Sequence, residues 1–338
     1  METPMKNHRS LLAAAVALPA AGLILAGCGS STASESTEAD SAAISVVATT
    51  NVYGQIARAI GGESVEVSEI ITSAAQDPHS YEPTARDKLA ISNATLVLAN
   101  GGGYDQFMDS LVSSIPEGKA GEITLVHAVD SSPVAEESEA AGHEGESAEE
   151  HAQHAEEDSH EGHDHSAYNE HIWYDLESMG DLADALAESF GKADSANAEQ
   201  YQQNAASFNE GIDKLEQQLE TAKLDGKSFV MTEPVPFHLL HAAGMEDATP
   251  EGLSEAIEEG EGIAPITMKK AEDLLSAGDA DMLAYNVQTE GSETKALKKS
   301  AELGQIPVVD FAETIQDDSS YLEWMESNIS DLASAING

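Results

Sequence analysis

The sequence is nearly devoid of cysteine, since Cys28 is its only one among 338 residues. A single cysteine excludes an internal disulfide and a metal site built from several thiolates. Basic residues are also scarce: 15 lysines and arginines stand against 62 aspartates and glutamates, a formal net charge of -47. Such a surface repels phosphate backbones, so we expect no nucleic-acid partner. The acidity either concentrates divalent cations locally or serves only to keep the protein soluble.

Long apolar runs are absent after the N-terminal segment 11–27, which follows Lys6, His8 and Arg9. A short apolar run behind a basic start is typical of a secretion signal rather than of a membrane span. It ends in Leu-Ala-Gly-Cys at residues 25–28, which resembles a bacterial lipobox. We therefore predict a lipoprotein signal peptide over residues 1–27, lipidation at Cys28, and a flexible tether over 28–43. The protein is then exported and anchored by lipid to the outer face of the cytoplasmic membrane.

From residue 44 onward, short β-rich runs alternate with helical patterns, which predicts parallel-rich sheets. One such series occupies residues 44–190 and a second occupies 224–338. Between them, residues 195–223 form the longest helical pattern in the chain. The predicted fold is α/β: two β/α lobes joined by one long helix. A ligand site in the cleft between the lobes, at the carboxyl ends of strands, is the default expectation.

The segment 131–167 interrupts the first lobe with glutamate, aspartate, histidine, alanine and glycine and almost no large apolar residue. A segment of this composition cannot form a core, so we predict a disordered loop. It either collects metal ions weakly near a tighter site or is a solvated linker whose histidines do nothing. Imidazole favours zinc, nickel and copper over manganese. The loop holds six of the 12 histidines: His143, His151, His154, His160, His163 and His165.

Three residues of types that metals favour follow predicted strand ends or open loops. His79 lies in a stiff loop between two prolines, and His171 stands where the ordered pattern resumes after the acidic loop. Glu233 follows the predicted strand 228–232. Neutral imidazoles with a carboxylate suit zinc or manganese. The ordinary alternatives are surface histidines and a carboxylate at a helix N-terminus.

Three segments together resemble the zinc/manganese family of ABC-transporter solute-binding proteins: residues 47–53 (VATTNVY), 77–84 (DPHSYEPT) and 170–174 (EHIWY). The similarity runs from about residue 44 to the C-terminus, and the second segment is the most specific. The resemblance implies a monomeric importer component that binds one divalent metal ion and delivers it to a membrane permease. It also implies two lobes bridged by a rigid helix, and a histidine-rich insert between the first and second ligands in zinc-binding members.

The resemblance also suggests ligands for the ion. His79 matches the first and His171 the second. The third is histidine in typical zinc members and glutamate in many manganese members, and Glu233 stands at that position. His238 or His241, on the following helical pattern, could replace it. We therefore expect Zn²⁺, with Mn²⁺ as the alternative.

The fourth ligand of the family is usually an aspartate in a loop after a later strand. Glu290 is the nearest carboxylate to that place, and an ordinary exposed loop glutamate is an equally good interpretation.

Two other classes of protein compete with a transport component. A metallohydrolase would use the open position of a similar site, but no general base stands beside these ligands in the sequence and no Gly-x-Ser-x-Gly motif is present. We therefore predict that the protein is not an enzyme. A metal-buffering or adhesin surface lipoprotein would instead use the histidine-rich loop. Stoichiometry separates the two, because a transport component holds one tight ion that depends on His79.

Overall fold

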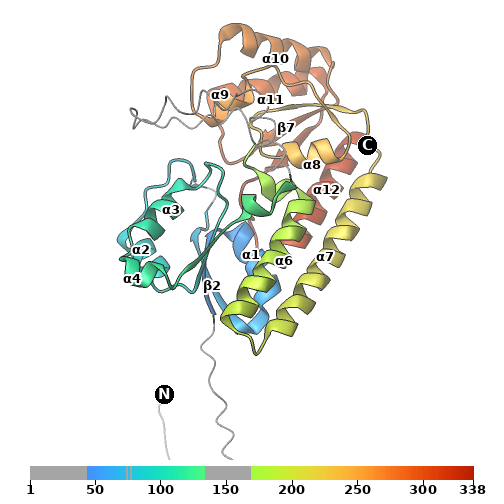
Figure 1. The fold of residues 1–338 in the computed structure, drawn as a ribbon. Helices are drawn as coiled ribbons and strands as arrows, with labels where there is room; N and C mark the ends of the chain where they lie inside the picture. The colour runs from blue at the N-terminus through green and yellow to red at the C-terminus, as the bar shows by residue number, and fades with distance from the viewer. Residues whose placement is uncertain (1–43, 74, 77, 134–168) are drawn as a thin grey trace, which may run out of the picture. The chain divides into compact units, whose positions relative to one another are not determined.

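The computed structural model describes residues 44–338 apart from 74, 77 and 134–168 (Figure 1). The predicted signal peptide, Cys28 and the tether lie outside the described residues, as do the six histidines of the predicted loop. No helix within the described part of the chain combines the length and apolarity needed to cross a bilayer.

The first lobe, called here the N-terminal lobe, is built on a parallel sheet of order β2-β1-β3-β4. Its central strands are short runs of β-branched and aliphatic residues, buried almost throughout, as expected where helices cover both faces. Its elements are β1 (Ile44–Thr50), α1 (Asn51–Gly61), η1 (Gly62–Ser64), β2 (Val65–Ile71), α2 (Ala85–Ser92), β3 (Leu96–Ala99), α3 (Gln106–Ser113), α4 (Glu117–Ala120), β4 (Thr124–His127), η2 (Ala128–Ser131), η4 (Ile172–Tyr174) and α6 (Leu176–Ala193).

The second, C-terminal lobe repeats this plan with a parallel sheet of order β6-β5-β7-β8. The predicted α/β class with two β/α lobes is thus confirmed, and both sheets are entirely parallel over the described strands. Its elements are β5 (Ser228–Met231), α8 (Phe237–Ala242), β6 (Glu246–Asp247), α9 (Ser254–Glu258), α10 (Pro265–Ala277), β7 (Met282–Asn286), α11 (Ser292–Gly304), β8 (Val308–Phe311) and α12 (Tyr321–Asn337).

The helix between the lobes, α7, covers Ala198–Thr221, within the predicted range 195–223. Asp194 accepts a hydrogen bond from the backbone of Ala196, and this turn precedes the helix. The side chains from Tyr201 to Leu219 that fall at helical spacing form one buried stripe. Helix α7 runs beside α6 (Figure 1), and Gly211 lets Leu322 of α12 approach closely, since a Cβ there would lie 2.5 Å from Leu322 Cδ1.

One apolar core extends from one sheet to the other. Alternate residues of each central strand point to opposite faces, so Val46 and Phe229 join this shared core whereas Val47 and Val230 belong to separate outer cores. Helices α1, α6, α7, α8 and α12 also supply the shared core. Because burial of apolar surface is the main stabilising term of a fold, separating the lobes widely would be costly.

Candidate metal site

The candidate site lies where loops leave the carboxyl ends of parallel strands. His79 follows β2, Glu233 follows β5 and Glu290 follows β7. His171 lies immediately before η4, and the buried Glu313 follows β8. Loops at this edge of a parallel sheet are the usual place for ligands in α/β proteins.

The structure brings His79 and His171 together with a third residue, Glu258 at the end of α9. One ligand atom from each lies within 4.8 Å of the other two. His171 Nε2 is 3.1 Å from Glu258 Oε1, and His79 Nε2 is 4.0 Å from the same oxygen. Two imidazoles and one carboxylate with these spacings can hold a single transition-metal ion, since such ions bind these groups at about 2.0–2.2 Å.

His171 is the buried member of the group, with its side chain 2% exposed. Its Nδ1 lies 2.7 Å from Asn169 Oδ1, and its ring packs against the edges of Tyr104 and Trp173. Burial lowers the pKa of His171 to about 4, although the charge of Glu313 opposes the shift. The imidazole is therefore neutral at pH 7, as a metal ligand must be.

His79 is the more accessible member, with its side chain 27% exposed. Its ring contacts Tyr104 at a centroid distance of 5.2 Å, and its Nε2 lies 3.3 Å from Glu170 Oε1. A cavity of about 190 Å³ opens beside it, lined by Pro78, His79, Tyr81, Gly103, Gln106 and Phe107. An ion arriving from this side would meet His79 before the buried His171.

Carboxylates crowd the neighbourhood of the two imidazoles. Burial, and then the charges of Glu258, Asp105 and Glu313, raise the pKa of Glu170 to about 8. Burial also raises the pKa of Glu313, and the charge of Glu233 adds to that shift. Groups that repel one another in this way would all be stabilised as anions by a bound cation.

Glu233 is buried, and its carboxylate accepts hydrogen bonds from Asn286 and Thr289. Asn286 Nδ2 also donates to Glu313 Oε1 at 2.9 Å, so the amide joins the two carboxylates. Among the described residues, the group of metal-binding atoms within 4.8 Å of one another contains Glu258 rather than Glu233. Glu233 therefore borders the site through Asn286 and Glu313.

The other ligand candidates lie elsewhere. Glu290 accepts a hydrogen bond of 2.9 Å from the Tyr285 hydroxyl and lies 3.5 Å from Lys295 Nζ, with its side chain 43% exposed. The hydrogen bond from Tyr285 is the main reason that the pKa of Glu290 is lowered. His238 Nε2 lies 2.8 Å from the carbonyl oxygen of Asn169, and the ring of His241 stacks on Phe237. None of the three belongs to the cluster around His79 and His171.

Sequence reasoning did not select Glu258, Glu313 or Asn169. Glu313 follows the predicted strand 308–310, so the strand-end criterion that selected Glu233 would also have selected it. Glu258 ends a five-residue helix inside an acidic stretch without apolar periodicity, and nothing in the sequence separates it from its neighbouring glutamates. Asn169 lies two residues before His171, and its amide gives no signal of its own in the sequence.

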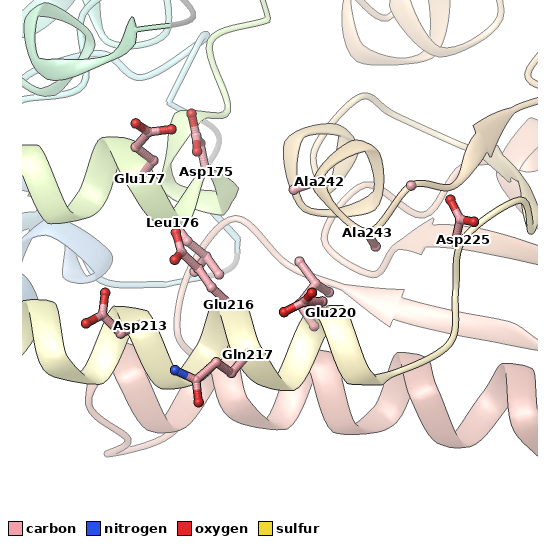
Figure 2. A pocket seen from close by; sticks show the side chains of 12 residues that line it. Asp175, Leu176, Glu177, Asp213, Glu216, Gln217, Glu220, Asp225, Ala242 and Ala243 are labelled. Atoms are coloured by element: carbon pink, nitrogen blue, oxygen red, sulfur yellow. The ribbon is translucent and has the colours of Figure 1, made fainter.

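A larger cavity, of about 580 Å³, lies between α6, α7 and α8. Figure 2 shows carboxylates around it, among them Asp175, which precedes α6, Glu177 of α6, and Glu216 and Glu220 of α7. Burial, followed by the charges of its acidic neighbours, raises the pKa of Glu216. Neither His79 nor His171 lines this cavity, and its lining residues include no histidine. This cavity is therefore distinct from the site formed by His79, His171 and Glu258.

Two parallel α/β lobes, with imidazoles from one and a carboxylate from the other meeting between strand-end loops, define the class of two-lobed ligand-binding proteins. Residues 46–335 match the model of a family described as zinc-uptake complex component A, periplasmic. The chain belongs to this family, whose members are substrate-binding proteins of metal transporters and not enzymes, as the sequence predicted.

The chain is similar over most of its length to proteins that are named for the metals they bind. The manganese-binding lipoprotein MntA of Halalkalibacterium halodurans is 22% identical over 328 residues, 93% of this chain and 95% of the relative. The manganese ABC transporter substrate-binding lipoprotein PsaA of Streptococcus pneumoniae is 25% identical over 98% of this chain and 100% of its own length. The structure of the periplasmic zinc-binding protein TroA from Treponema pallidum shares the fold, with a TM-score of 0.66 and 17% identity over 87% of this chain and 99% of that one.

Proposed function

We propose that this protein captures a divalent transition metal outside the cytoplasmic membrane and delivers it, as a monomer, to the permease of an ABC importer. Zinc is the proposed cargo. The observation that carries the proposal is the meeting of His79 and His171 of the N-terminal lobe with Glu258 of the C-terminal lobe. No bond of a substrate is made or broken in this function, which consists of capture, docking and release.

Ligands from both lobes make ion binding and lobe position interdependent. An ion held by His79, His171 and Glu258 contacts both lobes only when they approach, so it favours the closed arrangement. The shared core through α7 keeps that closure small. A permease that separates the lobes slightly would then weaken the site and release the ion.

Zinc is favoured by the paired imidazoles of His79 and His171 and by the six histidines of the predicted loop at residues 131–167. The chain contains no cysteine except Cys28, so thiolates do not select the metal. Manganese is the second candidate, because Glu170, Glu233, Glu258 and Glu313 supply the oxygen ligands that it prefers. Relatives named for each of these metals resemble the chain.

The location follows from Cys28. A lipidated cysteine after a cleaved signal peptide would tether the binding protein beside its permease, and several relatives are named lipoproteins. In cells fed a radiolabelled or clickable fatty acid, the wild-type chain should carry label and Cys28→Ser should not. Label that persists in the variant would contradict anchoring at this residue.

The metal assignment is tested by titration calorimetry on the full mature chain, together with elemental analysis of protein purified without added metal. We expect one tight ion per chain. His79→Ala and His171→Ala should each weaken zinc binding by more than the roughly 10- to 100-fold that loss of a supporting partner costs. The matched control is His127→Ala, which removes a partly exposed histidine paired with Asp109.

A tight site that survives both histidine substitutions would refute the proposal, whereas equal loss in the His127 control would show that the effect is not specific. Anomalous scattering at the zinc and manganese absorption edges then decides between the two metals.

A further inference from the structure

We infer that Asn169 is a positioning residue that fixes the tautomer of His171, so that Nε2 presents its lone pair to the ion. The same side chain ties the His171 loop to the loop that carries Glu233. This inference rests on the proposed function, in which His171 is a ligand, but the hydrogen bonds that support it are independent of any metal.

Asn169 makes contacts in three directions. Its Oδ1 accepts a hydrogen bond of 3.0 Å from the backbone N–H of His171 and lies 2.7 Å from His171 Nδ1. Its Nδ2 donates to the carbonyl oxygen of Pro234 at 2.9 Å. Its own carbonyl oxygen accepts from His238 Nε2 at 2.8 Å. The side chain therefore connects two loops that are 65 residues apart in the chain.

The chemistry of these partners leaves one orientation for the amide. The backbone N–H of His171 can only donate, so the atom facing it must be the amide oxygen. The carbonyl of Pro234 can only accept, so the atom facing it must be the amide nitrogen. Two independent partners thus determine which end of the amide is the oxygen and which is the nitrogen. The shape of the asparagine side chain alone does not determine this.

The orientation of the amide determines the proton on the imidazole. Oδ1 is an acceptor, so His171 Nδ1 must carry hydrogen and donate to it. In a neutral ring Nε2 then has no hydrogen and presents a lone pair. The Nε2 atom lies 3.1 Å from Glu258 Oε1, and a cation or a proton between two such acceptors makes their approach favourable. Hydrogen bonds of this kind orient metal-binding histidines in proteins generally.

His238 helps to hold Asn169 in place through a hydrogen bond to its backbone. The residue is 8% exposed, and its Nε2 donates a hydrogen bond to the backbone carbonyl oxygen of Asn169. This contact explains why a buried histidine in the neighbouring helix is not a member of the ligand cluster: its donor is directed at a backbone carbonyl.

The alternative is that Asn169 serves stability alone, as a tie between lobes. Asn51 provides a matched control, because its side chain donates to the Ile315 carbonyl at 2.7 Å and accepts from the Ile315 N–H at 3.1 Å, also between the lobes. Asn51→Ala removes a tie of the same kind without touching His171. Asn169→Asp is the second variant, since it keeps an acceptor for Nδ1 and loses the donor to Pro234.

The experiment uses the full mature chain labelled with ¹⁵N-histidine, and long-range ¹H–¹⁵N correlation spectra of metal-free protein at neutral pH. We expect His171 of the wild type to be the Nδ1–H tautomer. Asn169→Ala should shift it toward the Nε2–H tautomer, whereas Asn169→Asp and Asn51→Ala should leave it unchanged. Zinc affinity should fall by roughly 10- to 100-fold in Asn169→Ala and by less in the other two.

An unchanged tautomer in Asn169→Ala, or an equal loss of affinity in Asn51→Ala, would overturn the inference. If Asn169→Ala does not fold, Asn169→Asp decides, because loss of the Nδ1–H tautomer in that variant would also refute it. If the wild type binds no zinc but shows the expected tautomers, the proposed function fails and the positioning role stands.

Discussion

The hydroxyl of Tyr104, which follows β3 in the N-terminal lobe, donates a hydrogen bond of 3.1 Å to Glu313 Oε2, which follows β8 in the C-terminal lobe. The ring of Tyr104 also contacts the rings of His79 and His171, at centroid distances of 5.2 and 6.0 Å. One buried tyrosine thus touches both imidazoles and holds a carboxylate of the opposite lobe. The site and the contact between lobes therefore share a residue.

Tyr104→Phe should destabilise the protein while keeping the ring against the imidazoles. Glu313 is 7% exposed and would lose a donor, which typically costs about 1–3 kcal/mol of unfolding free energy. Urea unfolding followed by circular dichroism measures this loss. The matched control is Tyr201→Phe, whose hydroxyl bonds Asp194 in a partly buried setting and should cost less. Equal stability of wild type and Tyr104→Phe would show that this hydrogen bond contributes nothing net.

Asp281 should contribute an acid-sensitive part of the stability. Hydrogen bonds from the backbone of Ser228 and from Lys227 hold the pKa of Asp281 below its ordinary value. A group whose pKa is lowered by folding stabilises the protein above its unfolded pKa, about 3.9, and this contribution is lost as pH falls through the folded value. Asp281→Asn should therefore unfold at lower urea concentration at pH 7, and the difference should shrink below about pH 4.

The control for Asp281 is Asp279→Asn, which removes an exposed carboxylate in the same loop. It should leave the urea midpoint close to that of the wild type at both pH values. A difference between wild type and Asp281→Asn that stays constant down to pH 3 would contradict the assigned cause.

The fold was predictable because its signals are local. Buried strands such as Ile44–Thr50 are rich in β-branched and aliphatic residues, and α7 has apolar residues at helical spacing from Tyr201 to Leu219. The short elements β6 and α9 were not predicted, because two to five residues are too few to show a periodicity. Their positions are set by packing of the C-terminal lobe around them, which a single sequence does not display.

The site was predictable only in part, because not all of its residues stand in a distinctive local sequence. His79 and His171 stand out as histidines in distinctive local settings. Glu258 is one of several glutamates in residues 251–261, and only the folded chain distinguishes it by placing it 3.1 Å from His171. Glu290 was selected by its place in the chain, and the structure directs it toward Tyr285 and Lys295. Chain position predicts which loop lies near a site better than which side chain enters it.

Deleting residues 142–166 should remove weak metal binding and leave the tight ion in place. All six histidines of the predicted loop lie in the deleted range, while His79, His171 and Glu258 lie outside it. Histidines outside the tight site would raise the local ion concentration, which affects capture rate and weak sites rather than final affinity. Calorimetry with zinc should show fewer weak sites and an unchanged tight one. Loss of the tight site in the deletion variant would show that the loop contributes ligands directly.

The carboxylates of Glu258 and Glu290 should differ in how much each contributes to metal affinity, because they lie in different places. Glu258→Gln neutralises the carboxylate whose Oε1 lies 3.1 Å from His171 Nε2, and zinc affinity should fall by more than the roughly 10- to 100-fold that loss of a supporting partner costs. Glu259→Gln is the matched control, because it makes the same chemical change at the next residue, whose side chain is exposed. Glu290→Gln should also leave affinity unchanged, since that carboxylate is bound to Tyr285 and Lys295. Calorimetry with zinc and with manganese compares the three variants under one condition. If Glu290→Gln abolishes tight binding and Glu258→Gln does not, the fourth ligand suggested by family resemblance is the real one, and the approach of α9 to the imidazoles is not part of the bound site.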